Sequence, residues 1–282
     1  LKKIVITLIA FIQFGCSSNE KNNLQEMNLK GNIKSVKEIY YDGNEKFGEY
    51  VKEDWKYTIE YFFNESGNIT ERNSYYAPKN SIRDKTKYIY NNNNQIIEEY
   101  KYDSKGNLES TEKYKYDKTG NKIEKVTIED NKITITEKYI YDNKAKLIES
   151  YSVLPDGSKS IYAEKFNYNS EGLLLEKIEE IYNELDNSIN KTINKYNKEG
   201  QLIEISNQNS NSIAIKYVYD NNGEQTKQIN FYDDGTPSGD TFETIIKYDD
   251  KGNWINKSTI GKSEWSSKPD IRIEEREIEY NN

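Results

Sequence analysis

The chain holds few of the residue types that usually carry catalysis or bind metals. It has one Cys, Cys16, and no His among its 282 residues. A Cys/His zinc site, a Ser-His-Asp triad, a Cys-His dyad and an intrachain disulfide are therefore excluded. The candidates that remain are the single thiol, 48 acidic side chains, 25 Tyr and 3 Trp.

Cys16 follows a segment with the parts of a secretory signal. Lys2-Lys3 precede an apolar run from Ile4 to Phe14, and Gly15 lies directly before the Cys. The run is too short to span a bilayer, which needs about 20 apolar residues. The layout resembles a bacterial lipoprotein signal, although Gln13 stands where that motif usually has Leu. The resemblance implies a diacylglycerol on the Cys16 sulfur and cleavage just before this residue.

This interpretation divides the chain into three parts. Residues 1–15 are the expected signal peptide, 16–32 a polar tether and lead-in, and 33–282 a single β-domain. More than one acyl chain gives stable anchoring, so the protein is expected to sit on the outer membrane without crossing it. Whether it faces the periplasm or the cell surface is left open.

The acidic residues favour turns over chemistry. Asp233-Asp234-Gly235 and Asp249-Asp250-Lys251-Gly252 are the densest clusters of candidate calcium ligands, but neither has EF-hand spacing. Asp before Gly is typical of turns. A glycosidase needs two carboxylates about 5 to 9.5 Å apart, and 48 acids make such pairs inevitable. We therefore assign no catalytic residue, metal or cofactor, and expect no enzyme activity.

The aromatic residues are the more informative group. Most Tyr recur at regular spacing, which favours a packed sheet face over a ligand platform. A binding site is expected to break that regularity. The aromatic residues that break it, and that we select as ligand-contact candidates, are Trp55, Tyr75, Tyr76, Trp254 and Trp265.

One motif recurs along the chain: aromatic-x-aromatic, Asn or Asp, two residues, then Gly-Asn or a close variant. Without the copy at Tyr102, successive copies are 23 to 29 residues apart. The second aromatic residues of the nine copies are Phe63, Tyr90, Tyr102, Tyr116, Tyr141, Tyr168, Tyr196, Tyr219 and Tyr248.

Each copy predicts a β-hairpin. Asp or Asn opens the turn, Gly supplies a positive φ, and the preceding residues alternate with period two. Tyr57, Ile59, Tyr61 and Phe63, for example, share one face. The chain is thus predicted to be all-β, a long antiparallel meander of about 16 to 20 strands, open or curled. We expect no helix after the signal segment.

The motif resembles the YD repeat of RHS-type proteins, carried here by Tyr-Asp pairs such as Tyr116-Asp117 and Tyr141-Asp142. The resemblance covers roughly residues 35–280, and the end of the chain resembles small YD-repeat lipoproteins of Bacteroidota. It implies a strand meander that wraps into a hollow shell in large members. Those members are several times longer and carry a core motif and a toxin tail, so their delivery role is not transferred.

Three functions stay open. The first is a non-enzymatic, lipid-anchored cell-envelope protein that binds protein or glycan, or serves as a scaffold. The second is an envelope glycan hydrolase with a carboxylate pair, and the third is a structural protein that self-associates through sheet edges. A net charge of −8 argues against nucleic acid as a partner, because such surfaces are basic, so none is expected.

Overall fold

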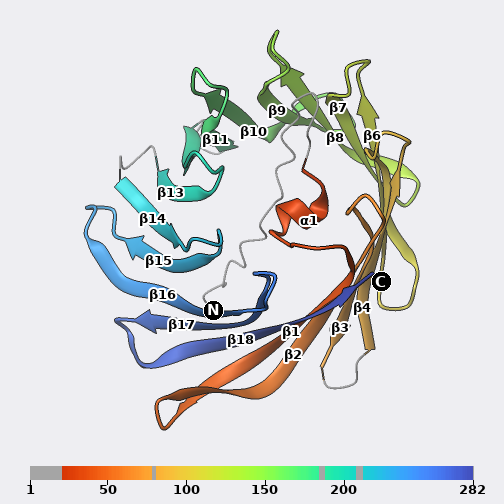
Figure 1. Ribbon diagram of the computed structural model, residues 1–282. Coiled ribbons are helices and arrows are strands. Elements are labelled where there is room, and N and C mark those ends of the chain that lie inside the picture. The colour runs from red at the N-terminus through yellow and green to blue at the C-terminus, as the bar shows by residue number, and fades with distance from the viewer. Residues whose placement is uncertain (1–20, 78–80, 184–187, 208–211, 282) are drawn as a thin grey trace.

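The structure is almost entirely β-sheet. The computed structural model describes residues 21–77, 81–183, 188–207 and 212–281 (Figure 1). The signal segment and Cys16 lie outside these residues. One short helix, α1 (Asn23–Glu26), precedes the strands, which are β1 (Ile33–Lys46), β2 (Glu49–Phe63), β3 (Ile69–Tyr76), β4 (Ser81–Tyr90), β5 (Ile96–Tyr102), β6 (Leu108–Tyr116), β7 (Lys122–Glu129), β8 (Lys132–Tyr141), β9 (Leu147–Val153), β10 (Lys159–Tyr168), β11 (Leu174–Asn183), β12 (Ser188–Tyr196), β13 (Leu202–Asn207), β14 (Ser212–Tyr219), β15 (Gln225–Phe231), β16 (Pro237–Tyr248), β17 (Trp254–Ser263) and β18 (Ser266–Tyr280).

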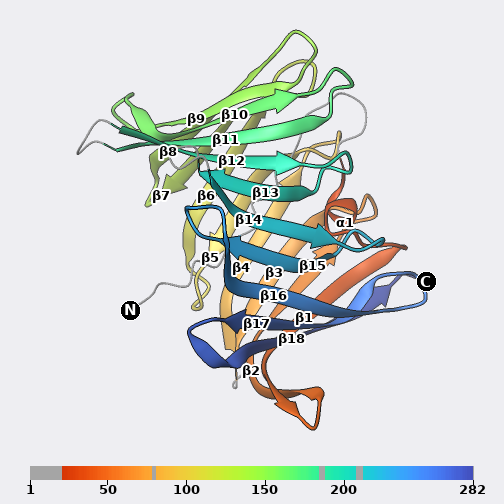
Figure 2. The same cartoon turned by 90° about the vertical axis from the view of Figure 1, so that its left-hand side faces the viewer.

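The sheet closes on itself. Each strand pairs antiparallel with the next, and β18 pairs with β1 from Ile33↔Tyr280 to Asp42↔Arg272. The predicted all-β meander is confirmed, and its 18 described strands form a closed barrel rather than an open or curled sheet (Figures 1 and 2). Closure pairs the backbone groups that the two edge strands of an open sheet would leave exposed.

The turns alternate between the two ends of the barrel. The repeat end carries the constant turns of the sequence motif, such as those at Gly67, Gly120 and Gly252. The variable end carries the other hairpin tips, including those of β1–β2 and β17–β18. The copy at Tyr102 is out of phase, because its turn joins β5 to β6 at the variable end. The other copies are regularly spaced because two strands and two turns separate each copy from the next.

The constant turn is built by one carboxylate or amide oxygen. Asp117 Oδ1 accepts the backbone N–H groups of Thr119 and Asn121, at 2.8 and 2.9 Å. The Thr119 hydroxyl also donates to it, and these bonds hold the pKa of Asp117 at about 2. Gly120 takes a φ of 93°, which the turn requires. The same two backbone bonds form at Asn64, Asn91, Asp103, Asp142, Asn197, Asp220 and Asp249.

A second hydrogen bond ties each repeat to the one before it. The Tyr116 hydroxyl donates to the backbone carbonyl of Ile96, 2.7 Å away, just after the preceding constant turn. The bond therefore spans one whole hairpin and sets the distance between neighbouring turns. Equivalent bonds run from Tyr90 to Ile69, Tyr141 to Lys122, Tyr168 to Leu147 and Tyr219 to Leu202.

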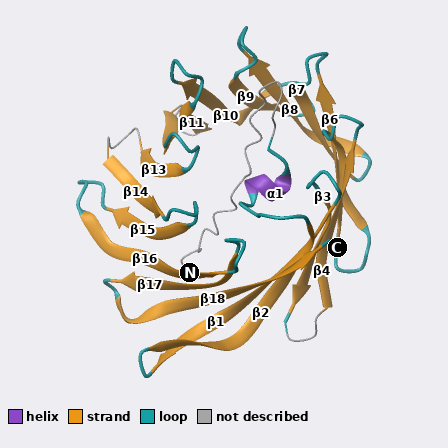
Figure 3. Ribbon diagram, viewed as in Figure 1, coloured by secondary structure: helices purple, strands orange, loops and turns teal. Residues whose placement is uncertain are grey.

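The second aromatic of the in-phase repeats lines the inside of the barrel. Helix α1 lies within the ring of strands, and the Tyr90 hydroxyl is 3.4 Å from Asn23 Oδ1 (Figure 3). Side chains alternate between the two faces of each strand, so the pairing register shows which residues of a neighbouring strand also face inward. Tyr114 and Tyr116 thus face inward, whereas Tyr100 and Tyr102 of the out-of-phase copy face outward. The predicted aromatic face is therefore the inner wall.

Aliphatic packing is confined to three small clusters. Leu29, Ile33 and Val36 pack under α1 at the repeat end, and a second cluster gathers around Phe166. The third, around Ile271, lies on the outer face near Tyr41. A chain with only 34% hydrophobic residues forms no thick core, so hydrogen bonds and ion pairs hold much of the wall.

The expectation that no helix follows the signal segment is wrong at α1. Asn22 accepts the backbone N–H of Gln25, and the Gln25 side chain accepts that of Asn22, which is a capping box. One turn is too short to show a 3.6-residue period, so only the cap marks it. Within the described residues, no helix has the length and apolar character to cross a membrane.

The tyrosine-to-carbonyl bond gives a direct test of the repeat. Tyr116→Phe removes the bond to Ile96 and leaves a carbonyl unpaired, so the free energy of unfolding should fall by roughly 0.5–1.5 kcal/mol. Urea denaturation measures this. Tyr102→Phe is the matched control, since no hydrogen bond from its hydroxyl is seen in the described part of the chain. Equal effects of the two substitutions would contradict the role of the in-phase hydroxyl.

Candidate functional site

A belt of alternating charges runs around the inner wall. On β5 to β8 the Lys101 ammonium lies 2.7 Å from Glu112 and 3.4 Å from Glu99. Lys125 lies 2.6 Å from Glu137 and 3.6 Å from Glu112. The register places these side chains on neighbouring strands of the same face. Glu112 and Glu137 therefore each have an opposite charge on a neighbouring strand, and Glu99 has Lys101 on its own strand, as partly buried ionic groups require.

Tyrosine hydroxyls complete the belt. Tyr114 donates to Glu112 at 2.7 Å and to Glu99 at 3.1 Å, and Tyr139 donates to Glu137 at 2.6 Å. Burial, reinforced by these carboxylates, raises the pKa of Tyr114 and Tyr139 far above the usual value. Both hydroxyls are thus fixed as neutral donors. Their rings cover the wall while their oxygens satisfy the carboxylates.

The two carboxylates around Tyr114 titrate differently. Burial, and then the charge of Glu112, raises the pKa of Glu99. Burial opposes ionisation of Glu112 as well, but the Lys101 hydrogen bond and the Lys125 charge hold its pKa below the usual value. A pair whose pKa values are driven apart is a recognised acid–base arrangement. No local pattern distinguishes this pair among the 48 acids of the chain.

The belt continues on both sides of β5–β8. On β10–β11, Lys177 lies 3.1 Å from Glu164 and 2.6 Å from Glu179. Across the closing pair β1–β18, Arg276 donates to Glu38 at 2.6 Å, with both side chains buried. Burial makes this pair costly to break, since either partner alone would be an unpaired buried charge.

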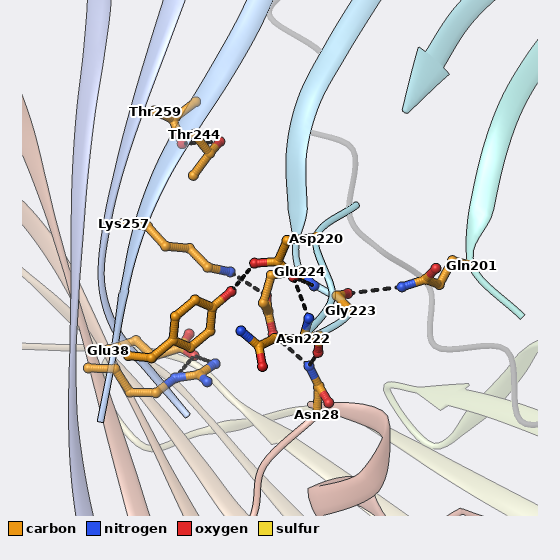
Figure 4. A network of polar contacts seen from close by, with 12 residues as sticks. Asn28, Glu38, Gln201, Asp220, Asn222, Gly223, Glu224, Thr244, Lys257 and Thr259 are labelled. Carbon is orange, nitrogen blue, oxygen red and sulfur yellow. Dashed lines mark hydrogen bonds and ion pairs between the residues drawn. The ribbon is translucent and has the colours of Figure 1, made fainter. Parts of the chain in front are cut away.

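Residues 22–32, which we call the strap, lie across the repeat end. The Leu24 N–H donates to the Gly67 carbonyl at 3.1 Å, and the Asn28 amide donates to the Asn222 carbonyl at 2.6 Å. Asn28 also donates to Glu224, which pairs with Lys257 at 2.7 Å (Figure 4). The strap thus joins turns that are far apart in the sequence.

Asn253 locks the strap to the closing strands. Its side-chain oxygen accepts the Lys30 N–H at 2.7 Å, and its amide nitrogen donates to the Lys30 carbonyl at 3.0 Å. The same nitrogen lies 3.0 Å from the Tyr280 hydroxyl. This amide is 1% exposed, so its bonds compete with no water. Asn253 is also part of a constant turn, so the same residue stabilises both that turn and the strap.

Three of the five predicted contact residues lie on β2 and β3, where Trp55 and Tyr75 share the outer face with Thr58 and Tyr76 faces inward beside Tyr57. Tyr75 and Tyr76 on β3 are in register with Thr58 and Tyr57 on β2. The Trp55 indole donates to the Thr58 hydroxyl at 3.1 Å, which places it beside this pair of strands. All three lie in the half of β2–β3 near the variable end, and Tyr76 is the most exposed.

The other two predicted contact residues lie apart. Trp254 is only 4% exposed, between the Arg276 guanidinium at 3.6 Å and the Lys257 ammonium at 4.3 Å from its ring. It caps the last strands from inside, so its position is that of a packed residue. Trp265 is 80% exposed at the tip of β17–β18, at the variable end.

The acidic clusters shape turns, as predicted. Asp234 accepts the N–H and the hydroxyl of Thr236, at 2.8 and 2.6 Å. Asp249 accepts two backbone N–H groups of its turn and the Tyr280 hydroxyl at 2.8 Å. These oxygens already have donors.

Comparison with known proteins identifies the repeat. A family model described as "Teneurin YD-shell" matches residues 98–258. No curated protein matches. Two solved structures are similar: a porin-like protein from Bacteroides uniformis has a TM-score of 0.47 and 12% identity, covering 88% of this chain and 98% of its own. A porin-like protein from Bacteroides vulgatus has a TM-score of 0.24 and 10% identity, covering 89% and 99%.

The raised pKa of Glu99 predicts a pH-dependent effect of substitution. A folded-state pKa above the unfolded value, about 4.3, means that the ionised group disfavours folding at higher pH, and this penalty disappears below the unfolded pKa. Glu99→Gln should therefore raise the melting temperature at pH 7 to 8, and the gain should shrink toward zero below pH ~4.

Thermal melts followed by circular dichroism from pH 3.5 to 8 measure this gain. The exposed Glu109→Gln on β6 is the control and should show little difference at any pH. A Glu99→Gln protein that is destabilised at pH 8 would show that the carboxylate contributes more through its Tyr114 and Lys101 bonds than it costs.

Proposed function

Because the chain belongs to the teneurin YD-shell family, we propose that its barrel is the rigid body of a lipid-anchored cell-envelope protein that binds glycan or protein without catalysis. The observation that carries this proposal is the difference between the two barrel ends. One end is crossed by the strap that follows Cys16, and the other presents exposed aromatic side chains.

The ion pairs on the outer wall favour water, rather than lipid, around the barrel. Facing outward, Lys113 pairs with Glu98 at 3.1 Å, and Glu180 pairs with Lys165 and Lys191 at 2.9 and 3.1 Å. A charge at the middle of a lipid-facing barrel wall costs about 2–4 kcal/mol for Lys or Arg. Such pairs occur on many strands, so a water-facing wall, with lipid only on Cys16, fits them best.

The strap supports a particular orientation. Asn22, whose amide donates to the Ser66 carbonyl at 2.8 Å, lies at the rim of the repeat end. The chain from Cys16 to Asn22 can reach at most about 20 Å, whatever its conformation. An acylated Cys16 therefore keeps the repeat end near the membrane and turns the variable end away from it.

Exposed aromatic side chains mark the variable end as the contact surface. Phe47 at the tip of β1–β2 is fully exposed, and Trp265 stands at the tip of β17–β18. These hairpins are neighbours, because β1 pairs with both β2 and β18. Trp55 and Tyr76 lie further from the tips, on β2 and β3. Together these residues offer the large rings that binding surfaces favour.

A hydrolase is the second candidate, and Glu99 with Glu112 is the observation that favours it. Glu99 would be the acid and Glu112 the base. The same oxygens are, however, bound by Tyr114 and Lys101, which favours a structural role. Self-association by edge addition is not proposed, because the 18 described strands pair into a closed ring and leave no free edge among them.

Lipid anchoring is tested at the thiol. Cys16→Ala should abolish metabolic labelling with a radioactive fatty acid and move the protein from the membrane fraction to the soluble fraction. Ser17→Ala, the next residue, is the control and should stay labelled. Labelling that persists in Cys16→Ala would remove the anchor from the proposal.

Binding is tested with a glycan array and a pull-down from envelope extract. The double variant Trp55→Ala/Tyr76→Ala should lose at least ten-fold in affinity for whatever the wild type captures, since aromatic contacts dominate such surfaces. Val218→Ala, an exposed residue on β14, should bind normally. Turnover of an envelope glycan that is lost in Glu112→Gln would instead establish the hydrolase.

A further inference from the structure

The belt of ion pairs is interrupted on one side of the barrel. Between β10–β11 and β17–β18, the inner faces of β12–β15 carry no charged side chain within the described residues. We call this part of the inner wall, together with Phe242 on β16, the neutral wall (Figure 1). Its other members are Asn194, Ile205, Ile215, Tyr217, Gln228 and Asn230. A ligand that lies there meets hydroxyl, amide and apolar groups, but no charge.

One row of side chains crosses the neutral wall. The pairing register sets Tyr217 beside Gln228 and Gln228 beside Phe242. Directly paired residues share a face, and Tyr217 lies two residues before Tyr219, an inward tyrosine of the repeat. The row therefore places an amide between two aromatic rings, whose strands are roughly 10 Å apart at two strand spacings.

The polar groups of this row are available to a ligand. Burial raises the pKa of Tyr217, but unlike Tyr114 and Tyr139 it forms no hydrogen bond through its hydroxyl in the described part of the chain. Gln228 donates to Asn230 Oδ1 at 2.9 Å, and its own side-chain oxygen has no donor among the same residues. Tyr217, Gln228 and Asn230 are each partly exposed to solvent. The row thus offers a hydroxyl, an amide oxygen and amide N–H groups.

A cavity of about 280 Å³ adjoins the row toward the variable end, between β16, β17 and β18. Phe242 is part of its lining, and Gly261 leaves room for the ring, because a Cβ there would lie 2.8 Å from Phe242 Cε1. Asp240 Oδ1, in the same lining, is buried and has no donor among the described residues. Such an acceptor is rarely left unsatisfied. Rotation of this short side chain toward the cavity would let a ligand hydroxyl supply the missing bond.

The charges that face the cavity balance one another. Arg272 pairs with Asp270 at 3.0 Å, and Lys268 and Asp240 carry opposite charges. Lys262 also belongs to the lining, but strand alternation turns its side chain to the outer wall. The cavity therefore selects neither an anion nor a cation, and it extends the uncharged character of the neutral wall.

We propose that the neutral wall and this cavity bind an uncharged glycan chain that enters through the variable end. Sugar rings stack on Tyr217 and Phe242, and hydroxyls between these rings bond to Gln228. A hydroxyl nearer the variable end donates to Asp240. The proposal rests on the proposed binding function and names the ligand class and the place where it binds.

A glycan fits these groups better than a peptide does. Sugar rings have an apolar face for the two aromatic rings, and their hydroxyls both donate and accept, as a row of mixed hydroxyl and amide groups requires. An extended peptide gains much of its affinity by adding to a free strand edge. The 18 described strands pair into a closed ring and leave no such edge among them.

Isothermal titration of the full chain in detergent micelles tests the site. The neutral probes are maltotetraose, cellotetraose and laminaritetraose, and tetragalacturonate is the anionic comparison. At least one neutral probe should bind at one site, with an affinity that does not fall as salt is raised, because no charges are paired. Tyr217→Ala and Phe242→Ala should each weaken this binding at least ten-fold.

Matched controls lie next to both residues. Val218→Ala and Thr241→Ala change the outer face of the same strands and should bind as the wild type does. Gln228→Leu keeps the size of the side chain and should also weaken binding, and circular dichroism melts show which variants fold. Failure of every neutral probe to bind, tighter binding of tetragalacturonate, or an equal loss in the outer-face controls overturns the site.

The outcomes separate this proposal from the general one. A tetrasaccharide is short enough to lie on the neutral wall alone, so Trp55→Ala/Tyr76→Ala should still bind it. If no tetrasaccharide binds but the glycan array or pull-down captures a ligand through Trp55 and Tyr76, the binding function stands without the neutral wall. If those assays are silent too, both proposals fail. Capture of a polypeptide that Tyr217→Ala abolishes would assign the wall to protein and overturn the glycan.

Discussion

The hydrogen bond from each repeat tyrosine to the carbonyl behind the preceding turn is the interaction on which the barrel depends. Tyr116 and Ile96 illustrate it. The Asx turn fixes where each hairpin ends, and the tyrosine fixes how far the next turn lies from it. Repeated around the sheet, these two constraints give neighbouring strands one consistent offset. A sheet with a constant offset and a right-handed twist can meet its own first strand, which is how β18 reaches β1.

The inner wall follows from a shortage of aliphatic residues. Tyrosine supplies ring area but brings a hydroxyl into the interior, and that hydroxyl needs a partner. Carboxylates such as Glu112 and Glu137 provide it, and Lys101 and Lys125 then neutralise the carboxylates. Each polar group in the belt therefore supplies the hydrogen-bond or charge partner that the previous group needs. This interdependence leaves the carboxylates of the inner belt engaged by tyrosine hydroxyls and lysines.

The two ends of the barrel differ in their turns. At the repeat end the turns are uniform, so one strap can bind several of them, and Asn253 and Lys30 fix it at the closing strands. At the variable end some turns, such as the one at Asp103, form the same bonds, but the turns differ from one another in length and side chains. Exposed Phe47 and Trp265 lie at hairpin tips of this end.

The strands, the constant turns and the aromatic face could be predicted from the sequence, because period-two alternation and Asp-x-x-Gly turns are local and repeat along the chain. The sequence also singled out Cys16, which stays a prediction. Only the tertiary structure decided closure, the burial of Trp254, and the docking of α1, whose capping box at Asn22 is a weak local signal. It alone paired Glu99 with Glu112 and placed Asp240 near Lys268. The physical reason is that these contacts join strands far apart in sequence or acids that look alike locally, and only the register around a closed barrel distinguishes them.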